Sequence, residues 1–230
     1  MMHFLAQYPD YWADWWPRLC DGALVSARLS LGGFVLALFL GGLLTWARSA
    51  PWPALRLAAA GFVQLMRAVP LLALLLALYF ALPGFGITLT GFWAGVVGLG
   101  LQGAAYIAEI LRGGLNAVHR GQREAGLAVG LAPWQIFVHI TLPQALRTML
   151  PPLLNAYVSI LKDSSLCALI ATNELMLAAR AISSESFLPM HVFLLAGLFY
   201  FVIAFPLSLL SRELQKRLHR GRKSLAGQTR

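Results

Sequence analysis

The chain has 230 residues, of which 59% are hydrophobic and only 12% are charged. Its mean hydropathy is +0.70, whereas about a quarter of the residues of a soluble globular domain are charged. This composition excludes a soluble domain and predicts a single all-α integral membrane domain covering residues 1–230. The net charge is +9, and seven of the 18 Lys and Arg residues lie from Arg212 onward. Such a tail next to a membrane span favours contact with anionic lipid headgroups over binding of nucleic acid.

Five segments are apolar enough and long enough to cross a bilayer, which takes about 20 residues per helix. The expected transmembrane helices lie at about residues 22–46, 57–82, 88–111, 146–171 and 186–211. The sequence PGFG at residues 83–86 predicts a turn between the second and third helices. The longest connection, at about residues 113–145, joins the third helix to the fourth.

Lys and Arg residues are distributed unevenly between the connections. They occur after the first and third helices and in the C-terminal tail, whereas the connection after the second helix has none. By the positive-inside rule, the N-terminus is expected outside and the C-terminus inside, so that residues 113–145 are cytosolic. The aromatic sequence YPDYWADWWP at residues 8–17 is then expected at the outer membrane interface.

The cytosolic connection contains two helix signals. Residues 121–130, GQREAGLAVG, predict a short helix that ends in a left-handed cap at Gly130. Pro133 suits the first position of a second helix, and Pro143 is expected to mark the boundary before the fourth transmembrane helix. The first helix carries a face of small side chains, made of Ala125, Gly126, Ala128 and Val129.

Two interpretations of this connection stay open on the residues alone. A small-sided face lets a partner protein approach the backbone closely, and the neighbouring charges of Arg123 and Glu124 could orient that partner. Alternatively, Trp134, Ile136 and Phe137 could lay an amphipathic helix on the lipid headgroups.

A family resemblance favours the first interpretation. Glu124-Ala125-Gly126, followed by Gly130 and later by Ile140, Leu142 and Pro143, resembles the EAA…G………I.LP signature of permease subunits in ATP-binding-cassette importers. Gly126 departs from the alanine of that signature, and glycine weakens a helix by about 1 kcal/mol relative to alanine. The sequences FVQLMRAVPLL, AAYIAEILRGGL, HRGQREAG, LPQALRTMLPPLLN and LKDSSL are similar to the polar amino-acid branch of these permeases, over about residues 21–217.

The resemblance implies a permease fold of the type I importer kind and a set of partners. The implied partners are a cytosolic ATPase dimer, a second permease subunit that is identical or paralogous, and a periplasmic or extracellular substrate-binding protein. It places the chain in the bacterial inner membrane, with a loop that couples to the ATPase. The implied coupling-loop residues are Arg123, Glu124, Ala125, Gly126, Gly130, Ile140, Leu142 and Pro143.

The chain itself contains no Gly-Lys dipeptide and hence no Walker A phosphate loop. We therefore expect no enzymatic activity and no cofactor in this chain, with ATP and magnesium bound by the partner ATPase. Cys20 and Cys167 fit no disulfide or metal framework, and the five His residues are scattered, so no metal site is expected.

Charged residues within the expected transmembrane helices are candidates for a translocation path or gate. Arg67 either lines a polar pocket near a kink at Pro70 or extends its side chain to the inner interface. Glu109 either pairs with Arg112 three residues along the same helix or closes an inner gate with Arg67. The sequence Gly91-x-x-x-Gly95 permits close helix contact, which tight packing within one subunit or a conduction path between two permease halves would use.

The sequence LKDSSL contains four more candidates, Lys162, Asp163, Ser164 and Ser165. Adjacent Lys and Asp side chains do not face each other on a helix, so they need outside partners, a water-filled cavity or a helix break. A polar break lining the path of a zwitterion fits these residues. The alternative is that they mark the outer end of a shorter transmembrane helix.

The predicted function is that of the transmembrane permease of an ATP-driven amino-acid importer, forming half of the translocation path. An importer of opines or other small zwitterions is the alternative within the same class. A secondary transporter or channel would commonly show inverted repeats or more helices, and a membrane enzyme would need a metal or nucleophile constellation. The sequence shows neither.

Overall fold

The computed structural model describes residues 8–226, and of Asp10 and residues 219–226 it describes the backbone alone. The basic tail is therefore described in full only to Leu218, and its remaining Lys and Arg side chains lie outside the described residues. No strand occurs in the described part of the chain. The helices are α2 (Tyr8–Ser49), α3 (Pro53–Ala68), α4 (Leu71–Leu76), α5 (Gly91–Asn116), α6 (Arg120–Ala128), α7 (Pro133–Ile136), α8 (Leu142–Asp163), α9 (Leu175–Ser186) and α10 (Pro189–Ala226). Shorter helical turns are the π-helices η1 (Ala77–Ala81) and η3 (Phe137–Thr141) and the 3₁₀ helices η2 (Leu82–Phe85) and η4 (Ser164–Ile170).

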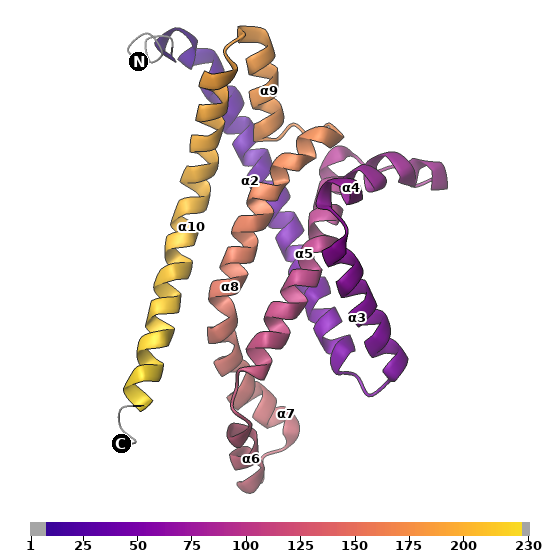
Figure 1. Cartoon of the computed structure of the whole chain (residues 1–230), viewed down its shortest axis with the longest axis vertical. Helices are drawn as coiled ribbons and strands as arrows, with labels where there is room; N and C mark the ends of the chain where they lie inside the picture. The colour runs from indigo at the N-terminus through magenta and orange to yellow at the C-terminus, as the bar shows by residue number, and fades with distance from the viewer. Residues whose placement is uncertain (1–7, 227–230) are drawn as a thin grey trace.

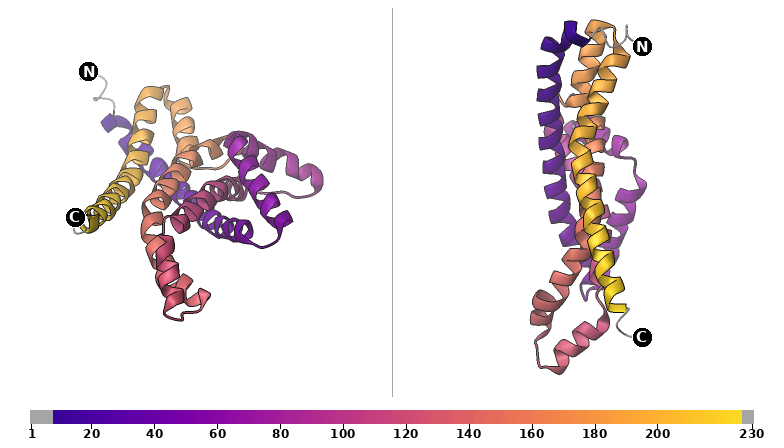
Figure 2. Two further views of the ribbon diagram at one scale, coloured as in Figure 1. Left: turned by 60° about the horizontal axis from the view of Figure 1, so that its bottom comes forward. Right: turned by 90° about the vertical axis from the view of Figure 1, so that its left-hand side faces the viewer.

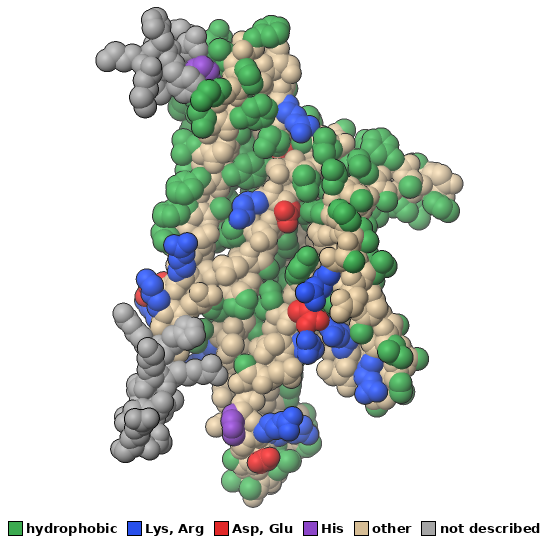
Figure 3. Space-filling model, in the orientation of Figure 1, with side chains coloured by type: hydrophobic (Ala, Val, Ile, Leu, Met, Phe, Trp, Pro, Cys, Tyr) green, Lys and Arg blue, Asp and Glu red, His purple; other side chains and the backbone are tan. Residues whose placement is uncertain are grey.

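The long helices run along the length of the molecule (Figures 1 and 2). The N-terminal end of α2 lies at one end, whereas α6, α7 and the C-terminal end of α10 lie at the other (Figure 1). In the face shown in Figure 3, hydrophobic side chains cover much of the surface, and several Lys and Arg side chains gather in its lower half. An apolar exterior of this kind suits a bundle that is surrounded by lipid.

Four helices of the described chain are long and apolar enough to cross a membrane, or five if one bent pair counts as one span. α2 extends past the expected span of residues 22–46 at both ends. α5 and α10 begin later than the expected spans of residues 88–111 and 186–211, at Gly91 and Pro189, and continue past their C-terminal ends. The all-helical architecture with four to five apolar helices agrees with the predicted fold class.

The expected helix at residues 57–82 is broken near its middle. α3 ends at Ala68, and the chain turns by 103° before it continues through α4 and η1 to η2. Pro70 stands at the start of α4, where its ring and its missing N–H prevent the helix from continuing. The turn predicted at residues 83–86 is confirmed, because Gly86 has a φ of 81° and its N–H donates to Pro83 O at 3.0 Å.

The boundary predicted at Pro143 is wrong. The helical path runs without a sharp bend from α7 through η3 into α8. Pro143 lies in the first turn of α8, directly after the π-helical turn η3. A π-helical turn shifts the hydrogen-bond register by one residue, which is one way to place a proline in a helix without breaking it. The fourth transmembrane helix therefore begins inside the connection, at Pro133.

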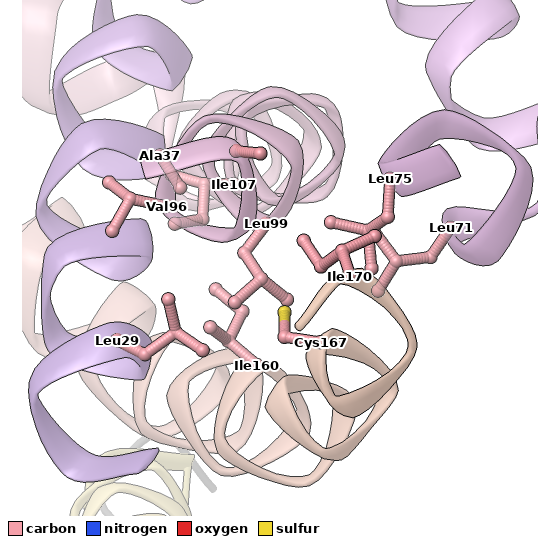
Figure 4. Close-up of a cluster of buried hydrophobic side chains, with 11 residues drawn as sticks. Leu29, Ala37, Leu71, Leu75, Val96, Leu99, Ile107, Ile160, Cys167 and Ile170 are labelled. Carbon is pink, nitrogen blue, oxygen red and sulfur yellow. The ribbon is translucent and has the colours of Figure 1, made fainter. Parts of the chain in front are cut away.

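The main core lies where α2, α4, α5, α8 and η4 meet (Figure 4). Leu99 and Ile170 point into it together with Leu29 and Cys167 (Figure 4). A Cβ at Gly95 would come within 2.9 Å of Leu29 Cδ1, and one at Gly91 would overlap the carbonyl oxygen of Ile170. The two glycines therefore serve packing within one subunit.

A second core joins the N-terminal end of α2 to α9 and α10. Trp15, from the aromatic segment at residues 8–17, is only 2% exposed there and packs inside the bundle. The sequence did not predict α9, which lies in the connection expected between the fourth and fifth transmembrane helices. Its N-cap is Glu174, which is fully buried and accepts hydrogen bonds from Ser26, Tyr200 and the N–H of Leu177.

Candidate functional site

A cavity of about 400 Å³ lies between α4, α5 and α8. Most of its wall is apolar, as expected for the middle of a membrane bundle, but five polar side chains interrupt that wall. Two come from α5 and three from α8, and on α8 they follow the helical spacing of one face. The polar lining residues are Gln102, Tyr106, Asn155, Ser159 and Asp163.

Asp163 alone among the seven path candidates lines this cavity. Lys162 is exposed but is not part of the cavity wall. The hydroxyl groups of the two serines donate to backbone carbonyls one turn back, Ser164 to Leu161 at 2.7 Å and Ser165 to Lys162 at 2.8 Å. The predicted helix interruption is present, because the α-helix changes into the 3₁₀ helix η4 at Ser164.

Arg67 lies in the last turn of α3, three residues before Pro70, and its side chain is exposed. Its guanidinium carbon is 5.9 Å from the ring centroid of Tyr106, a cation–π distance. Neither Arg67 nor Pro70 lines the cavity. Both lie beside it, because Tyr106 and Leu71 belong to the wall.

Glu109 takes part in a network at the end of α5 nearest α6. It accepts hydrogen bonds from Arg112, at 2.6 Å to Nη2, and from Arg48 of α2, at 2.5 Å to Nη1. The predicted pair with Arg112 is confirmed. The alternative pair with Arg67 is wrong for this conformation, because Arg67 stacks on Tyr106 instead. No sequence signal indicates Arg48, since that contact depends on where α2 passes α5.

The connection between α5 and α8 folds into a compact unit, which we call the inner loop (residues 113–145). Its helix α6 has the predicted left-handed cap, since Gly130 has a φ of 81°. The N–H of Leu131 donates to Gly126 O, and that of Gly130 donates to Leu127 O, each at 3.0 Å. These two bonds form a Schellman motif, which satisfies carbonyls that the helix end leaves open.

The expected small-sided face of α6 is divided between two sides. Ala125, Ala128 and Val129 are exposed, but Gly126 is buried inside the inner loop. A Cβ at Gly126 would come within 2.8 Å of Ile136 Cγ1 and 3.3 Å of Ile140 Cδ1. Close packing against Ile136 thus gives a physical reason for glycine at this position, and Gly126 belongs to the loop's interior rather than to a docking face.

The other coupling-loop candidates fall into the same two groups. Arg123 and Glu124 are exposed beside Ala125 on the outer side of α6. Ile140, Leu142 and Pro143 lie in the helical path into α8, with Ile140 facing Gly126. The described residues contain no group of three His, Cys, Asp or Glu side chains that could hold a metal ion.

Comparison with known proteins identifies a family and several relatives. Residues 33–223 match the family described as binding-protein-dependent transport system inner membrane component. The chain is 36% identical to the glutamine transport system permease protein GlnP of Escherichia coli (strain K12), over 90% of this chain and 97% of that protein. It is 38% identical to the probable glutamine ABC transporter permease protein GlnM of Bacillus subtilis (strain 168), over 69% of this chain and 74% of that protein.

Solved structures show the same fold. A crystal structure of an amino acid ABC transporter with histidines matches with a TM-score of 0.83 and 27% identity, covering 89% of this chain and 96% of that one. An inward-facing structure of the MetNI methionine ABC transporter matches with a TM-score of 0.67 and 21% identity, covering 86% of this chain and 96% of that one.

Proposed function

Because the chain belongs to the family of binding-protein-dependent transport system inner membrane components, we propose that its cavity is part of an amino-acid translocation path. The chain is the multi-pass, membrane-spanning permease subunit of an ATP-binding-cassette importer. ATP hydrolysis in such an importer belongs to partner subunits, and a substrate-binding protein supplies the cargo. Relatives named for glutamine transport support amino acids as the cargo.

The polar groups of the cavity suit a zwitterion. The carboxylate of Asp163 can accept hydrogen bonds from an α-ammonium group, and the side chains of Asn155 and Ser159 can donate to an α-carboxylate. All three lie on one face of α8 and line the same space. The apolar remainder of the wall leaves room for a side chain. The presence of these polar groups in an apolar bundle is the observation that carries the proposal.

The inner loop is the proposed docking element for a cytosolic ATPase. Its exposed outer side offers Arg123, Glu124 and Ala125, which combine two charges with a small side chain. The charges can orient a partner, and Ala125 lets the partner approach the backbone of α6. Since the inner loop lies at the same end of the molecule as the C-terminal end of α10 (Figure 1), this end is the proposed cytosolic side, in line with the positive-inside rule.

The proposed assembly has two permease subunits around a two-fold axis and two ATPases that bind ATP and magnesium. One cavity on one side of a bundle suits half of a path, which a second copy or a paralogue completes. The assembly has two conformations, and ATP binds the ATPases more tightly in one of them, so that ATP shifts the population toward that conformation. In that conformation the path opens to the side where the binding protein delivers cargo.

The proposal is tested by uptake of a radiolabelled amino acid into proteoliposomes that contain the whole importer. Asp163→Asn is expected to lower uptake at least about tenfold, because a charge-assisted hydrogen bond is lost. Lys162→Gln is the matched control, since it removes a neighbouring charge that is not part of the cavity wall. This variant is expected to keep the uptake rate close to that of the unmodified importer. Equal effects of both changes, or none from Asp163→Asn, would reject the cavity as the path.

A further inference from the structure

The break between α3 and α4 leaves backbone carbonyls without their helical partners. In a continuous helix the N–H of residue 70 would donate to the carbonyl of Met66, four residues earlier. Pro70 has no N–H, so the Met66 carbonyl loses this bond. Val69 is extended, with φ −79° and ψ 129°, so its own carbonyl leaves the helical ladder as well. An open carbonyl is costly within a membrane, where little water is available to satisfy it.

Gln102 of α5 supplies the missing donors. Its side-chain nitrogen Nε2 lies 2.9 Å from Val69 O and 3.5 Å from Met66 O. An amide nitrogen carries two hydrogens, so one side chain can serve both carbonyls. One of the two acceptors is the carbonyl that Pro70 cannot serve.

A second contact fixes the same segment to the same face of α5. Tyr106 lies one helical turn after Gln102, and its ring lies under the guanidinium group of Arg67. The last turn of α3 is thus held at two points, four residues apart on α5. Gln102, Tyr106 and Leu71, the first residue of α4, all belong to the cavity wall. The position of the break therefore sets the shape of the cavity.

We propose that Gln102 is a positioning residue of the translocation path, which replaces the hydrogen bond removed by Pro70 and so holds the α3–α4 break against the cavity. Its effect on transport rests on the proposed function of the cavity. Its effect on the break does not, and can be measured separately.

The first measurement is the geometry of the break. Spin labels are placed on α3 and η1 by Leu57→Cys and Phe80→Cys, both exposed positions, with Cys20 and Cys167 replaced by alanine. Gln102→Leu keeps the approximate size of the side chain but removes the donor, and is expected to broaden the distance distribution between the labels. Gln102→Asn keeps an amide donor and is expected to preserve part of the narrow distribution. Gln64→Leu, which removes an exposed glutamine from α3, is the control and should leave it unchanged.

The second measurement is a double-mutant cycle with Pro70→Ala, read as uptake by the whole importer. In the chain that keeps Pro70, Gln102→Leu is expected to lower uptake about tenfold, because the carbonyls of Val69 and Met66 both lose their donor. Because Pro70→Ala restores a backbone N–H that can donate to the Met66 carbonyl, Gln102→Leu should have a smaller effect in that background.

The outcomes distinguish the claim that Gln102 holds the α3–α4 break from the claim that the break matters for transport. An unchanged distance distribution, or equal fold-losses of uptake in both backgrounds, overturns the role of Gln102. A broadened distribution with unaltered uptake overturns the link between the break and transport, and Asp163→Asn then tells whether the cavity is on the path at all.

Discussion

The inner loop and the cavity are built in opposite ways. The loop turns one glycine inward, where Gly126 packs against Ile136, and exposes charged and small side chains on its outer side. The cavity gathers polar side chains in its wall, where Asp163 and Asn155, both exposed, interrupt apolar residues. The loop thus offers the surface that we propose for a partner protein, whereas the cavity offers the space that we propose for a small-molecule cargo.

One helical path connects the two regions. It begins at Pro133, carries Ile136 and Ile140 of the loop, and continues through α8 to the cavity residues Ser159 and Asp163. Ile140 and Ser159 are 19 positions apart, or about 28 Å at 1.5 Å per residue. If an ATPase docks on the loop as proposed, its displacement is passed to the cavity wall along this helical path, which contains Pro151 and Pro152 between the two regions.

The largest expected effect comes from breaking the inner loop itself. Gly126→Trp places a large side chain where even a Cβ is 2.8 Å from Ile136 Cγ1, so α6 can no longer pack on the start of the helical path. We expect uptake to fall to background and the loop to become more sensitive to limited proteolysis.

Ala125→Trp is the matched variant on the exposed side of the same helix. It should keep the loop resistant to protease but abolish co-purification with the ATPase, because the added ring blocks the docking side. If both variants still retained the ATPase and transported normally, the inner loop would not be the coupling element.

An intermediate effect is expected from loosening the helix that joins the two regions. Leu146 and Leu150 lie on α8 between the loop and the cavity, and both side chains are partly exposed. Replacing both with glycine costs the helix about 2 kcal/mol relative to alanine. ATP hydrolysis by the assembled importer should continue, whereas the amount of amino acid carried per ATP should fall several-fold.

The double alanine variant of Leu146 and Leu150 is the control, since it removes the same side chains and keeps the helix stiff. Simultaneous measurement of phosphate release and uptake in proteoliposomes distinguishes the two variants. Equal transport per ATP in both would show that α8 does not carry the movement.

The smallest expected effect lies outside both regions, at the N-terminal end of α2. Arg18 donates to both carboxylate oxygens of Glu185, at 2.6 and 2.8 Å, and these hydrogen bonds lower the pKa of Glu185. A carboxyl group with a lowered pKa stabilises the fold above its unfolded-state pKa and loses that contribution as the pH falls through its folded-state pKa. The pair is solvent-exposed, so its contribution is small.

Glu185→Gln should therefore lower Tm slightly at pH 7. Below the pKa of Glu185, where the unmodified carboxyl group is also protonated, the variant and the unmodified chain should melt together. Glu124→Gln, at another exposed carboxylate, is the control. A Tm difference that persists unchanged into acid would contradict a stabilising ion pair between Arg18 and Glu185.

The sequence predicted those parts of the molecule that are encoded locally. The left-handed cap at Gly130, the helix start at Pro133 and the turn ending at Gly86 each depend on the conformational preference of one residue and its neighbours. The ion pair of Glu109 with Arg112 follows from helical spacing in the same way.

Most of the failures concern contacts that form only when separate helices pack together. Nothing near Gly126 in the sequence indicates that Ile136 covers it, nor does the spacing of Glu109 reveal Arg48 on α2. The prediction of a helix boundary at Pro143 was wrong because a π-helical turn directly before the proline lets the helix continue through it. Gln102 escaped notice because its role depends on a break in another helix.

The most direct test of the account is whether the inner loop and α8 move as one body. Spin labels at Gln122→Cys and Leu150→Cys in the assembled importer measure the distance between the loop and α8, and the reaction of Ser159→Cys with a water-soluble maleimide measures access to the cavity. We predict that ATP leaves the distance unchanged and alters the rate of the maleimide reaction. A distance that changes with ATP while the maleimide rate stays constant would contradict the account.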